Sequence, residues 1–227
     1  AVIQGVVELL HENNINSSDI KMIIHGTTLA TNAIIERKGA KTCFITTEGF
    51  RDVLDIGYES RFDQYDILIE KTMSLVPRKH RYVIEERTDI NGNIIKPINT
   101  KKFHSLVDTI KNEKFESIGI GFLHSYANSK NENELKEFLL KYLPDVEVSI
   151  SSDVCPEIRE YERFTTTVVN SYIKPLISTY LKKLDTDLTQ KGFKCPLLLM
   201  TSGGTLTNVT SACNIPVRLV ESGPAGG

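Results

Sequence analysis

The segment IIHGTTLATNAIIER, residues 23–37, constrains the fold of this chain more than any other feature. A short apolar run ends at His25 and Gly26, and apolar residues with helical spacing begin immediately afterwards. This pattern predicts a strand, a tight polar turn and a helix, the repeating unit of a parallel α/β sheet. Free backbone N–H groups at the start of that helix, beside three threonine hydroxyl groups, would suit an anion or a polarised carbonyl oxygen.

The rest of the chain continues the alternation of strands and helices. The dipeptide Asn91-Gly92 predicts a hairpin between residues 82–88 and 94–98, and residues 57–78 lack a clear period and predict a long surface excursion. The long apolar period after residue 157 predicts a helix that is kinked or divided near Pro175. The expected helices cover 1–13, 28–38, 50–56, 100–113, 131–142 and 157–192, and the expected strands cover 20–25, 41–46, 117–123, 146–150, 196–200 and 216–220.

Composition narrows the class of partner. The chain has 227 residues, 40% of them hydrophobic, which is enough for a sizeable core in one large or two small domains. The net charge is −2 and the sequence has no long run of like charges, so nothing indicates a basic surface that would bind nucleic acid or an anionic membrane. We therefore expect a small-molecule partner. Four widely spaced cysteines, no secretory leader and no apolar stretch near the roughly 20 residues of a membrane helix predict a reduced, cytoplasmic protein.

Both ends of the sequence fall within expected helices. Residue 1 has no capping residue before it, and residues 224–227 are an unfinished helix entry. We therefore expect a piece of a longer protein, with one region at residues 1–150 and the start of a second at 151–227.

Four polar junctions follow predicted strands, where open α/β sheets bind their ligands. They are residues 25–28, 124–126, 201–204 and 221–227. If the strands before His25 and His124 are parallel neighbours, both imidazoles reach one rim and could share a substrate, a water or a metal. The alternative is that each histidine only bonds to backbone at the end of its strand.

Charged residues at 157–163, EIREYER, open the long helix. Arg159, Glu160 and Arg163 could position a carboxylate or a phosphate, whereas such a run more often forms a solvated helical face. The carboxylates Asp63 and Asp66 lie in the long excursion, and nothing in their spacing fixes a role. The sequence contains no P-loop, nucleophile elbow, zincin or dinucleotide fingerprint.

Five ordered segments of the sequence resemble the hydantoinase A / 5-oxoprolinase family. They are HGTTLATNAIIERKGAKT, TTEGFRDVLDIGYESR, GFLHSYANSKNE, PEIREYERFTTTVVNSYIKPL and ESGPAGG. The resemblance implies an α/β fold, with a parallel or mixed sheet and flanking helices, within the actin/Hsp70/sugar-kinase (ribonuclease H-like) architecture. It implies an ATP- and Mg²⁺-dependent enzyme that phosphorylates the amide oxygen of a hydantoin or 5-oxoproline ring before water opens it, partnered by a hydantoinase B-like subunit or domain.

The resemblance also supplies candidate site residues and one departure. Both Asp-Gly-Gly-Thr phosphate hairpins of the family are absent, so we expect the chain alone to be inactive and to bind no cofactor tightly. Ser202, Gly203 and Gly204 correspond to a family turn that often reads Ser-Asn-Gly-Gly, so one residue of that turn is missing or shifted here. The predicted catalytic residues are His25, His124 and Glu160, with the metal content left open. The predicted binding residues are Gly26, Thr27, Thr28, Thr31, Asn32, Ser125, Tyr126, Arg159, Arg163, Ser202, Gly203, Gly204, Ser222, Gly223 and Gly226.

Two other functions stay open. Relatives in the same superfamily carboxylate ketones after a similar activation by ATP, so a ketone carboxylase subunit is the first alternative. The absence of both phosphate hairpins also allows a ligand-binding or interaction module without turnover.

Overall fold

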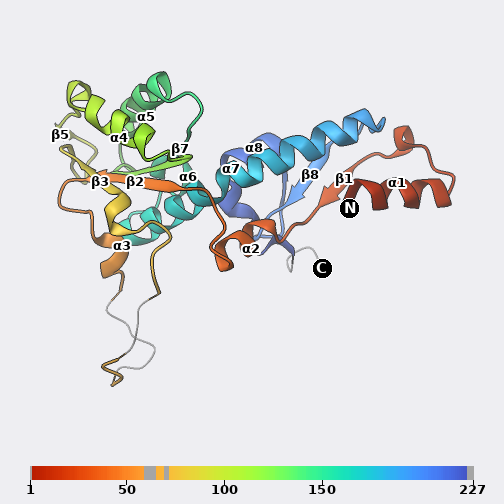
Figure 1. Ribbon diagram of the computed structural model, residues 1–227, viewed down its shortest axis with the longest axis horizontal. Helices are drawn as coiled ribbons and strands as arrows, with labels where there is room; N and C mark the ends of the chain where they lie inside the picture. Colours follow the sequence, from red (N-terminus) through yellow and green to blue (C-terminus); the bar gives the residue numbers. More distant parts are fainter. Residues whose placement is uncertain (1, 59–64, 69–71, 224–227) are drawn as a thin grey trace. The chain divides into compact units, whose positions relative to one another are not determined.

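The computed structural model describes residues 2–58, 65–68 and 72–223. The chain divides into two compact units. Unit 1 combines Ala1–Gly39 with Ile173–Gly227, and unit 2 is Ala40–Tyr172. The predicted mixed α/β class, with parallel strands and flanking helices, is confirmed (Figure 1).

Unit 1 is built on a three-stranded mixed sheet in the order β1-β8-β9. Strand β1 (Ile23–His25) runs parallel to β8 (Leu197–Met200), and β8 pairs antiparallel with β9 (Leu206–Asn208). His25 is in register with Leu199, so both strands end at the same edge of the sheet. The other elements are α1 (Val2–Glu12), η1 (Ser17–Asp19), α2 (Leu29–Ile35), α8 (Val209–Asn214) and η4 (Pro216–Leu219).

Unit 2 is built on a four-stranded parallel sheet in the order β3-β2-β6-β7. The strands are β3 (Arg81–Ile84), β2 (Thr42–Thr47), β6 (Ser117–Gly121) and β7 (Glu147–Ile150). The two central strands are buried along their whole length, as expected for parallel strands covered on both faces. Helices α4 (His104–Asn112) and α5 (Lys130–Tyr142) lie on one side of this sheet, and α3 (Val53–Ile56) and the start of α7 (Glu160–Gln190) on the other (Figure 1).

Side-chain alternation along β2 divides the core of unit 2 between the two faces. Cys43 and Ile45 pack in the cluster shared with α4 and α5, whereas Phe44 packs on Phe164 of α7 with ring centroids 5.3 Å apart. At Gly121 an added Cβ would lie 2.6 Å from the Phe164 ring and 2.7 Å from the Phe44 ring. Glycine is therefore required there for close packing of helix on sheet.

The structure corrects three predicted elements. Residues 216–220 are not a strand: Pro216 lacks a ladder donor and its fixed φ favours the 3-10 helix η4. Helix α7 is one helix of 31 residues and is not divided at Pro175, because buried Ile173 and Ile177 hold it on both sides of the proline. The predicted hairpin forms only in part. Strand β4 (Arg87–Thr88) pairs with β5 (Ile94–Lys96), whereas residues 81–84, expected in the same hairpin arm as β4, join the main sheet as β3.

Three short helices complete unit 2: η2 (Arg78–His80), η3 (Thr100–Lys102) and the one-turn helix α6 (Ser151–Val154).

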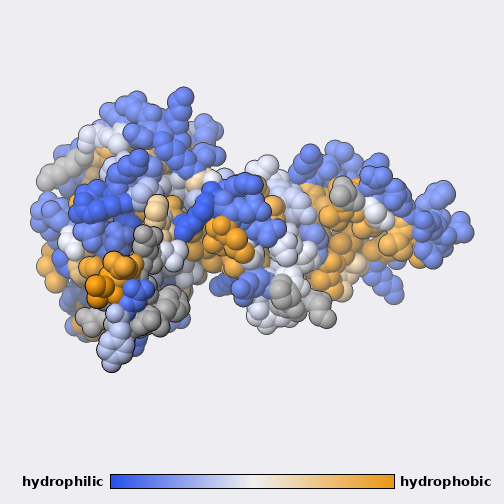
Figure 2. Space-filling view, turned by 60° about the horizontal axis from the view of Figure 1, so that its bottom comes forward, coloured by the Kyte–Doolittle hydropathy of each residue, from blue (hydrophilic) through white to orange (hydrophobic). Residues whose placement is uncertain are grey.

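The surface mixes hydrophilic and hydrophobic residues, with orange patches set among blue ones in Figure 2. In unit 1 the exposed apolar side chains include Leu9, Ile24 and Ile35, the last 73% exposed. Among the helices that the structure describes, none is long and apolar enough to cross a membrane. Within the described part of the 57–78 excursion, Tyr65, Ile67 and Leu68 are exposed, Tyr65 to 91%, whereas Val76 is fully buried in the core of unit 2.

Candidate functional site

Three of the four predicted junctions meet in unit 1. The first follows β1, the third follows the neighbouring parallel strand β8, and the fourth follows η4. The backbone N–H of Ser202 donates to the carbonyl oxygen of Arg218 (2.8 Å), which places the turn after β8 beside the segment that leads to Glu221. The backbone N–H of Glu221 donates to Thr31 Oγ1 of α2 (2.9 Å).

Ser222 joins the first junction to the last. Its side chain is buried, and its hydroxyl donates to the carbonyl oxygen of Thr27 (3.0 Å) and accepts from the Thr27 N–H (3.5 Å). An added Cβ at Gly223 would lie 2.9 Å from the Thr28 methyl group, so only glycine allows this approach without a shift. Gly26 and Thr28 are exposed on the surface of this assembly.

His25 contacts a side chain of α7. Its Nε2 lies 2.8 Å from the Tyr180 hydroxyl, and the two rings are tilted with centroids 5.9 Å apart. Burial holds the pKa of His25 below its usual range, so the imidazole is neutral at pH 7. Of the two sequence interpretations, a histidine that only bonds to backbone does not describe His25, since its ring nitrogen meets a phenol.

The turn after β8 is a hairpin rather than an entry to a helix. The Thr201 N–H donates to the Thr205 carbonyl (2.8 Å), and the Gly204 N–H donates to the Thr201 carbonyl (3.0 Å). Gly204 has φ +73°, a conformation that favours glycine. Ser202, Gly203 and Gly204 are exposed. A Cβ at Gly204 would meet open space, and one at Gly203 would lie 4.0 Å from Thr201 Oγ1.

The remaining junction, residues 124–126, lies in unit 2. His124 has φ +56°, an uncommon left-handed conformation for a non-glycine residue, and its Nδ1 lies 3.4 Å from the Tyr126 hydroxyl. Ser125 is buried and bonds to Ser151 Oγ (2.9 Å). Backbone strain of this kind is often kept at functional sites.

A buried carboxylate and a buried guanidinium hold this turn from both sides of Phe122. Glu132, fully buried, accepts the Phe122 N–H (2.9 Å), and Arg163, also fully buried, donates to the Phe122 carbonyl (3.1 Å). Glu132 also accepts from Ser151 Oγ (2.6 Å) and from both the N–H and the hydroxyl of Ser152 (2.9 and 2.7 Å). With four donors around it, the carboxylate compensates its burial and fixes the chain path after β6.

Arg163 thus differs from its predicted surroundings. Its guanidinium donates to the carbonyl oxygens of Glu157 and Ile158 as well as Phe122, and it lies over the Tyr126 ring at 5.4 Å. A residue fully buried among backbone carbonyls belongs neither to a solvated helical face nor to a surface that binds anions directly. Burial lowers the pKa of Arg163, and the nearby charge of Glu132 opposes that effect.

The other charges of the 157–163 cluster are more accessible. Arg159 is exposed and Glu160 is partly exposed at the first turn of α7. Glu162 accepts a hydrogen bond from the Tyr58 hydroxyl, which lowers the pKa of Glu162 and raises that of Tyr58.

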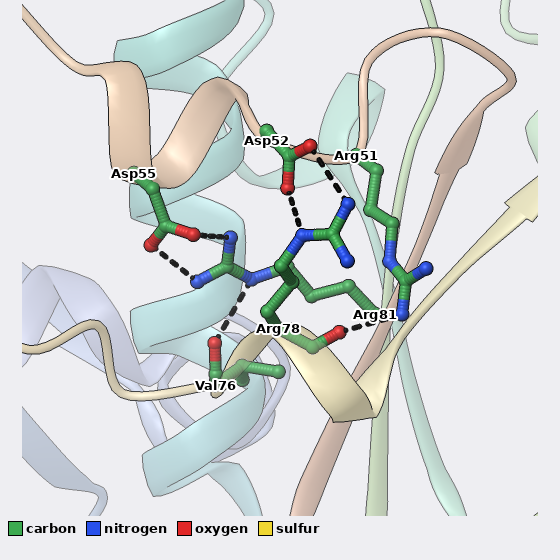
Figure 3. A network of polar contacts seen from close by, with 6 residues as sticks. All are labelled: Arg51, Asp52, Asp55, Val76, Arg78 and Arg81. Atoms are coloured by element: carbon green, nitrogen blue, oxygen red, sulfur yellow. Dashed lines mark hydrogen bonds and ion pairs between the residues drawn. The ribbon is translucent and has the colours of Figure 1, made fainter.

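A second network of charged side chains connects α3 with the end of the long excursion and the start of β3 (Figure 3). The Arg81 side chain, 1% exposed, makes two hydrogen bonds of 2.7 Å to Asp55 and one of 3.0 Å to the Val76 carbonyl. Arg78 pairs with Asp52, and this hydrogen bond holds the pKa of Asp52 below its usual range. The network joins α3 to β3 across the excursion and has a structural role.

Several sequence expectations need correction or lie outside the description. The strands before His25 and His124 are not neighbours, because β1 pairs with β8 while β6 pairs with β2 and β7. The two histidines belong to different units, and whether they converge, which the sequence left open, stays open. Gly226, Arg61 and Asp63 lie outside the described residues. Within residues 2–58, 65–68 and 72–223, no group of three or more His, Cys, Asp or Glu side chains could hold a metal ion.

Sequence reasoning missed Tyr180, Glu132 and Ser151. Tyr180 appeared only as one apolar position of a long helix, and the sequence carried no signal for its hydroxyl. Glu132 lies in a segment, GFLHSYANSKNE, that was singled out, but a glutamate at the start of a helix is usually solvated.

The mixed α/β fold is consistent with an actin-like ATPase fold, and comparison with known proteins specifies the family. Residues 1–143 match the model of the hydantoinase/oxoprolinase N-terminal region, and residues 163–227 match that of hydantoinase/oxoprolinase. The chain therefore belongs to the hydantoinase/oxoprolinase family.

Its relatives include an uncharacterized protein of Methanocaldococcus jannaschii, 39% identical over 98% of this chain and 33% of the relative. The caprolactamase subunit alpha of Pseudomonas jessenii is 32% identical over 92% of this chain and 30% of its own length. The chain thus spans about a third of the length of each of these two relatives.

Two solved structures are similar to this one. The crystal structure of the ATP-dependent caprolactamase from Pseudomonas jessenii gives a TM-score of 0.89 at 30% identity, covering 99% of this chain and 33% of that one. The nucleotide-free acetone carboxylase gives 0.80 at 25% identity, covering 90% of this chain and 30% of that one.

Proposed function

We propose that this chain is part of an ATP-dependent subunit that opens a cyclic amide, such as 5-oxoproline, a hydantoin or a lactam. The likeness to the ATP-dependent caprolactamase carries the proposal, because it extends over 99% of the chain at a TM-score of 0.89. Since the relatives are about three times as long, the activity is proposed for a longer protein that contains this region.

The assembled junctions of unit 1 fit a site for the nucleotide or the activated substrate. Exposed Gly26 lies next to the Ser222 backbone, and exposed Thr28 lies next to Gly223. The exposed turn at residues 202–204 leaves room for close approach of a ligand to backbone. ATP would supply a phosphoryl group to the amide oxygen, which would make the ring carbon electrophilic enough for water to attack and the C–N bond to break. Mg²⁺ is expected with ATP, but the described residues offer no ligand cluster for it, so we assign it no residue of this chain.

In this proposal some of the predicted residues contact the ligand, and others support the turns. His25, at the end of β1, is the candidate hydrogen-bonding group for the substrate oxygen. His124, Tyr126, Arg159 and Glu160 are candidate contacts in unit 2. Arg163, Ser125, Thr27, Thr31 and Ser222 hold the backbone of the two turns and act through it. Asn32, exposed on α2, is a candidate contact beside Thr28.

A ketone carboxylase subunit is the second candidate. The likeness to acetone carboxylase favours it, although that match is weaker in both TM-score and identity. For both candidate functions we propose a partner subunit of the hydantoinase B type. The relative from Pseudomonas jessenii supports this proposal, because it is named as an alpha subunit.

Phosphate release by the longer protein, purified with its partner, tests the proposal. ATP turnover should rise on addition of 5-oxoproline, hydantoin or caprolactam. Turnover that requires acetone or acetophenone together with bicarbonate would instead establish the carboxylase. Turnover stimulated by none of these compounds would refute both.

His25 offers the sharpest variant for that assay. His25→Ala should lower turnover by about 100-fold with little loss of stability, since a half-buried residue at a strand end buries little area. His11→Ala, at an exposed position of α1, is the matched control and should retain activity. A fully active His25→Ala enzyme would remove His25 from the site.

A further inference from the structure

Tyr180 forms a hydrogen-bond contact with the ring of His25. It comes from α7, 155 residues further along the chain, and its hydroxyl reaches Nε2 at 2.8 Å. The contact lies inside unit 1, at the edge of the sheet where β1 and β8 end. Nothing in the sequence pattern separates Tyr180 from the apolar residues around it.

The chemistry of the two groups sets the direction of this hydrogen bond. A phenol is a far stronger acid than the N–H of a neutral imidazole, so the favoured bond has the Tyr180 O–H as donor and Nε2 as acceptor. Burial raises the pKa of Tyr180 and lowers that of His25, so both groups are uncharged at neutral pH. The proton of the neutral ring must then be on Nδ1.

We propose that Tyr180 is a positioning residue that fixes the orientation and the Nδ1–H tautomer of His25. His25 thereby becomes a hydrogen-bond donor at the end of β1, suited to an oxygen of the substrate, and does not act there as a base through Nε2. This role in turnover rests on the proposed function, whereas the tautomer is a property of the chain and can be measured without substrate.

The tautomer is read from the imidazole nitrogen shifts of the chain labelled with ¹⁵N-histidine. The chain has five histidines, and His25→Gln assigns the signal of interest. The unsubstituted chain should have His25 as the Nδ1–H form. Tyr180→Phe keeps the ring and removes only the hydroxyl, so it should convert the signal to a mixture of tautomers. Tyr142→Phe is the control, because the Tyr142 ring contacts His104, and it should leave the His25 signal unchanged.

Turnover of the longer protein provides the second measurement. Tyr180→Phe should lower kcat by about 10-fold with little change in KM, while its thermal unfolding midpoint stays close to that of the parent. An Nε2–H signal in the parent chain, or an unchanged signal in Tyr180→Phe, would overturn the inference regardless of the measured kcat. A shifted signal with normal kcat would overturn the positioning role. A shifted signal with lowered kcat would support it.

The two proposals can fail separately. If no cyclic amide or ketone stimulates phosphate release, the proposed function falls, and the nitrogen shifts still decide whether Tyr180 sets the tautomer of His25.

Discussion

The Ser222 hydroxyl donates a hydrogen bond to the carbonyl oxygen of Thr27, 195 residues earlier in the chain, at 3.0 Å. This buried contact brings the turn after β1 together with the segment that follows η4. Both turns are polar, and each by itself is an ordinary connection. Joined, they form one surface at the edge of the unit 1 sheet.

Removing this contact should weaken unit 1. Ser222→Ala leaves the Thr27 carbonyl without its buried partner, and we expect a loss of about 1 to 2 kcal/mol in the free energy of unfolding. Urea denaturation measures it. Ser202→Ala, at an exposed serine, is the control and should change stability by less than about 0.5 kcal/mol. Equal effects of both substitutions would contradict the role given to Ser222.

Arg163 should be irreplaceable even by lysine. Arg163→Lys loses the planar group that reaches three carbonyl oxygens, and it leaves a charge buried with fewer partners. We expect a loss of about 2 to 4 kcal/mol in the free energy of unfolding. The exposed Arg159→Lys variant provides the comparison in the same denaturation experiment and should be nearly neutral. A stable Arg163→Lys protein would show that the Phe122 turn is held by Glu132 alone.

A pair of glycine substitutions separates packing from helix propensity. In Gly121→Ala the new methyl group would overlap the rings of Phe44 and Phe164, and we expect destabilisation of about 1 to 3 kcal/mol. Gly5→Ala, in α1 with open space around it, should instead be neutral or stabilising by up to about 1 kcal/mol. Thermal unfolding of the two variants checks the opposite signs. A neutral Gly121→Ala variant would mean that helix and sheet separate easily there.

Glu86 should make stability fall as the pH rises. Burial raises its pKa, against the hydrogen bonds from Thr47 and Asn131 that favour the carboxylate. The folded protein therefore binds this proton more tightly than the unfolded chain does. The resulting stabilisation is present below the pKa of an unfolded glutamate and is lost as the pH rises toward the raised value, at a rate of at most about 1.4 kcal/mol per pH unit.

Urea midpoints measured at several pH values test this dependence. Glu86→Gln removes the titrating group, so its stability relative to the parent should increase from pH 4 to pH 7. Glu48→Gln, at an exposed glutamate, is the control and should run parallel to the parent. A constant difference between Glu86→Gln and the parent would mean that Glu86 ionises in the folded protein as it does in the unfolded chain.

Much of the fold followed from local patterns. The strand at 42–47, the helix at 130–142 and the strand at 147–150 lie close to the predicted ranges, because buried parallel strands and amphipathic helices have distinct apolar periods. The errors arose where a local rule met tertiary packing. Pro175 was expected to kink or divide α7, and the helix is not divided there, because Ile173 and Ile177 are buried on both sides of the proline.

The sequence predicted the individual segments of the candidate site but not which of them lie side by side in the fold. Residues 25–28, 201–204 and 221–223 were recognised because polar and glycine residues follow apolar runs. That β1 and β8 are parallel neighbours could not be derived, since the sequence between them includes all of unit 2. For the same reason the sequence left open whether the strand that ends before His124 is a neighbour of β1, and the structure pairs that strand with β2 and β7 instead.

The sequence by itself determined the α/β class, the order of most elements and the family, because these depend on periods and motifs within short segments. Tertiary structure alone decided that Tyr180 meets His25, that Ser222 meets Thr27, and that Arg163 is buried among carbonyl groups. Each of these contacts joins residues through the packing of α7 or the sheets. A hydrogen bond forms only when its donor and acceptor are placed to within a few tenths of an ångström. The spacing of residues along the chain does not encode positions that precise.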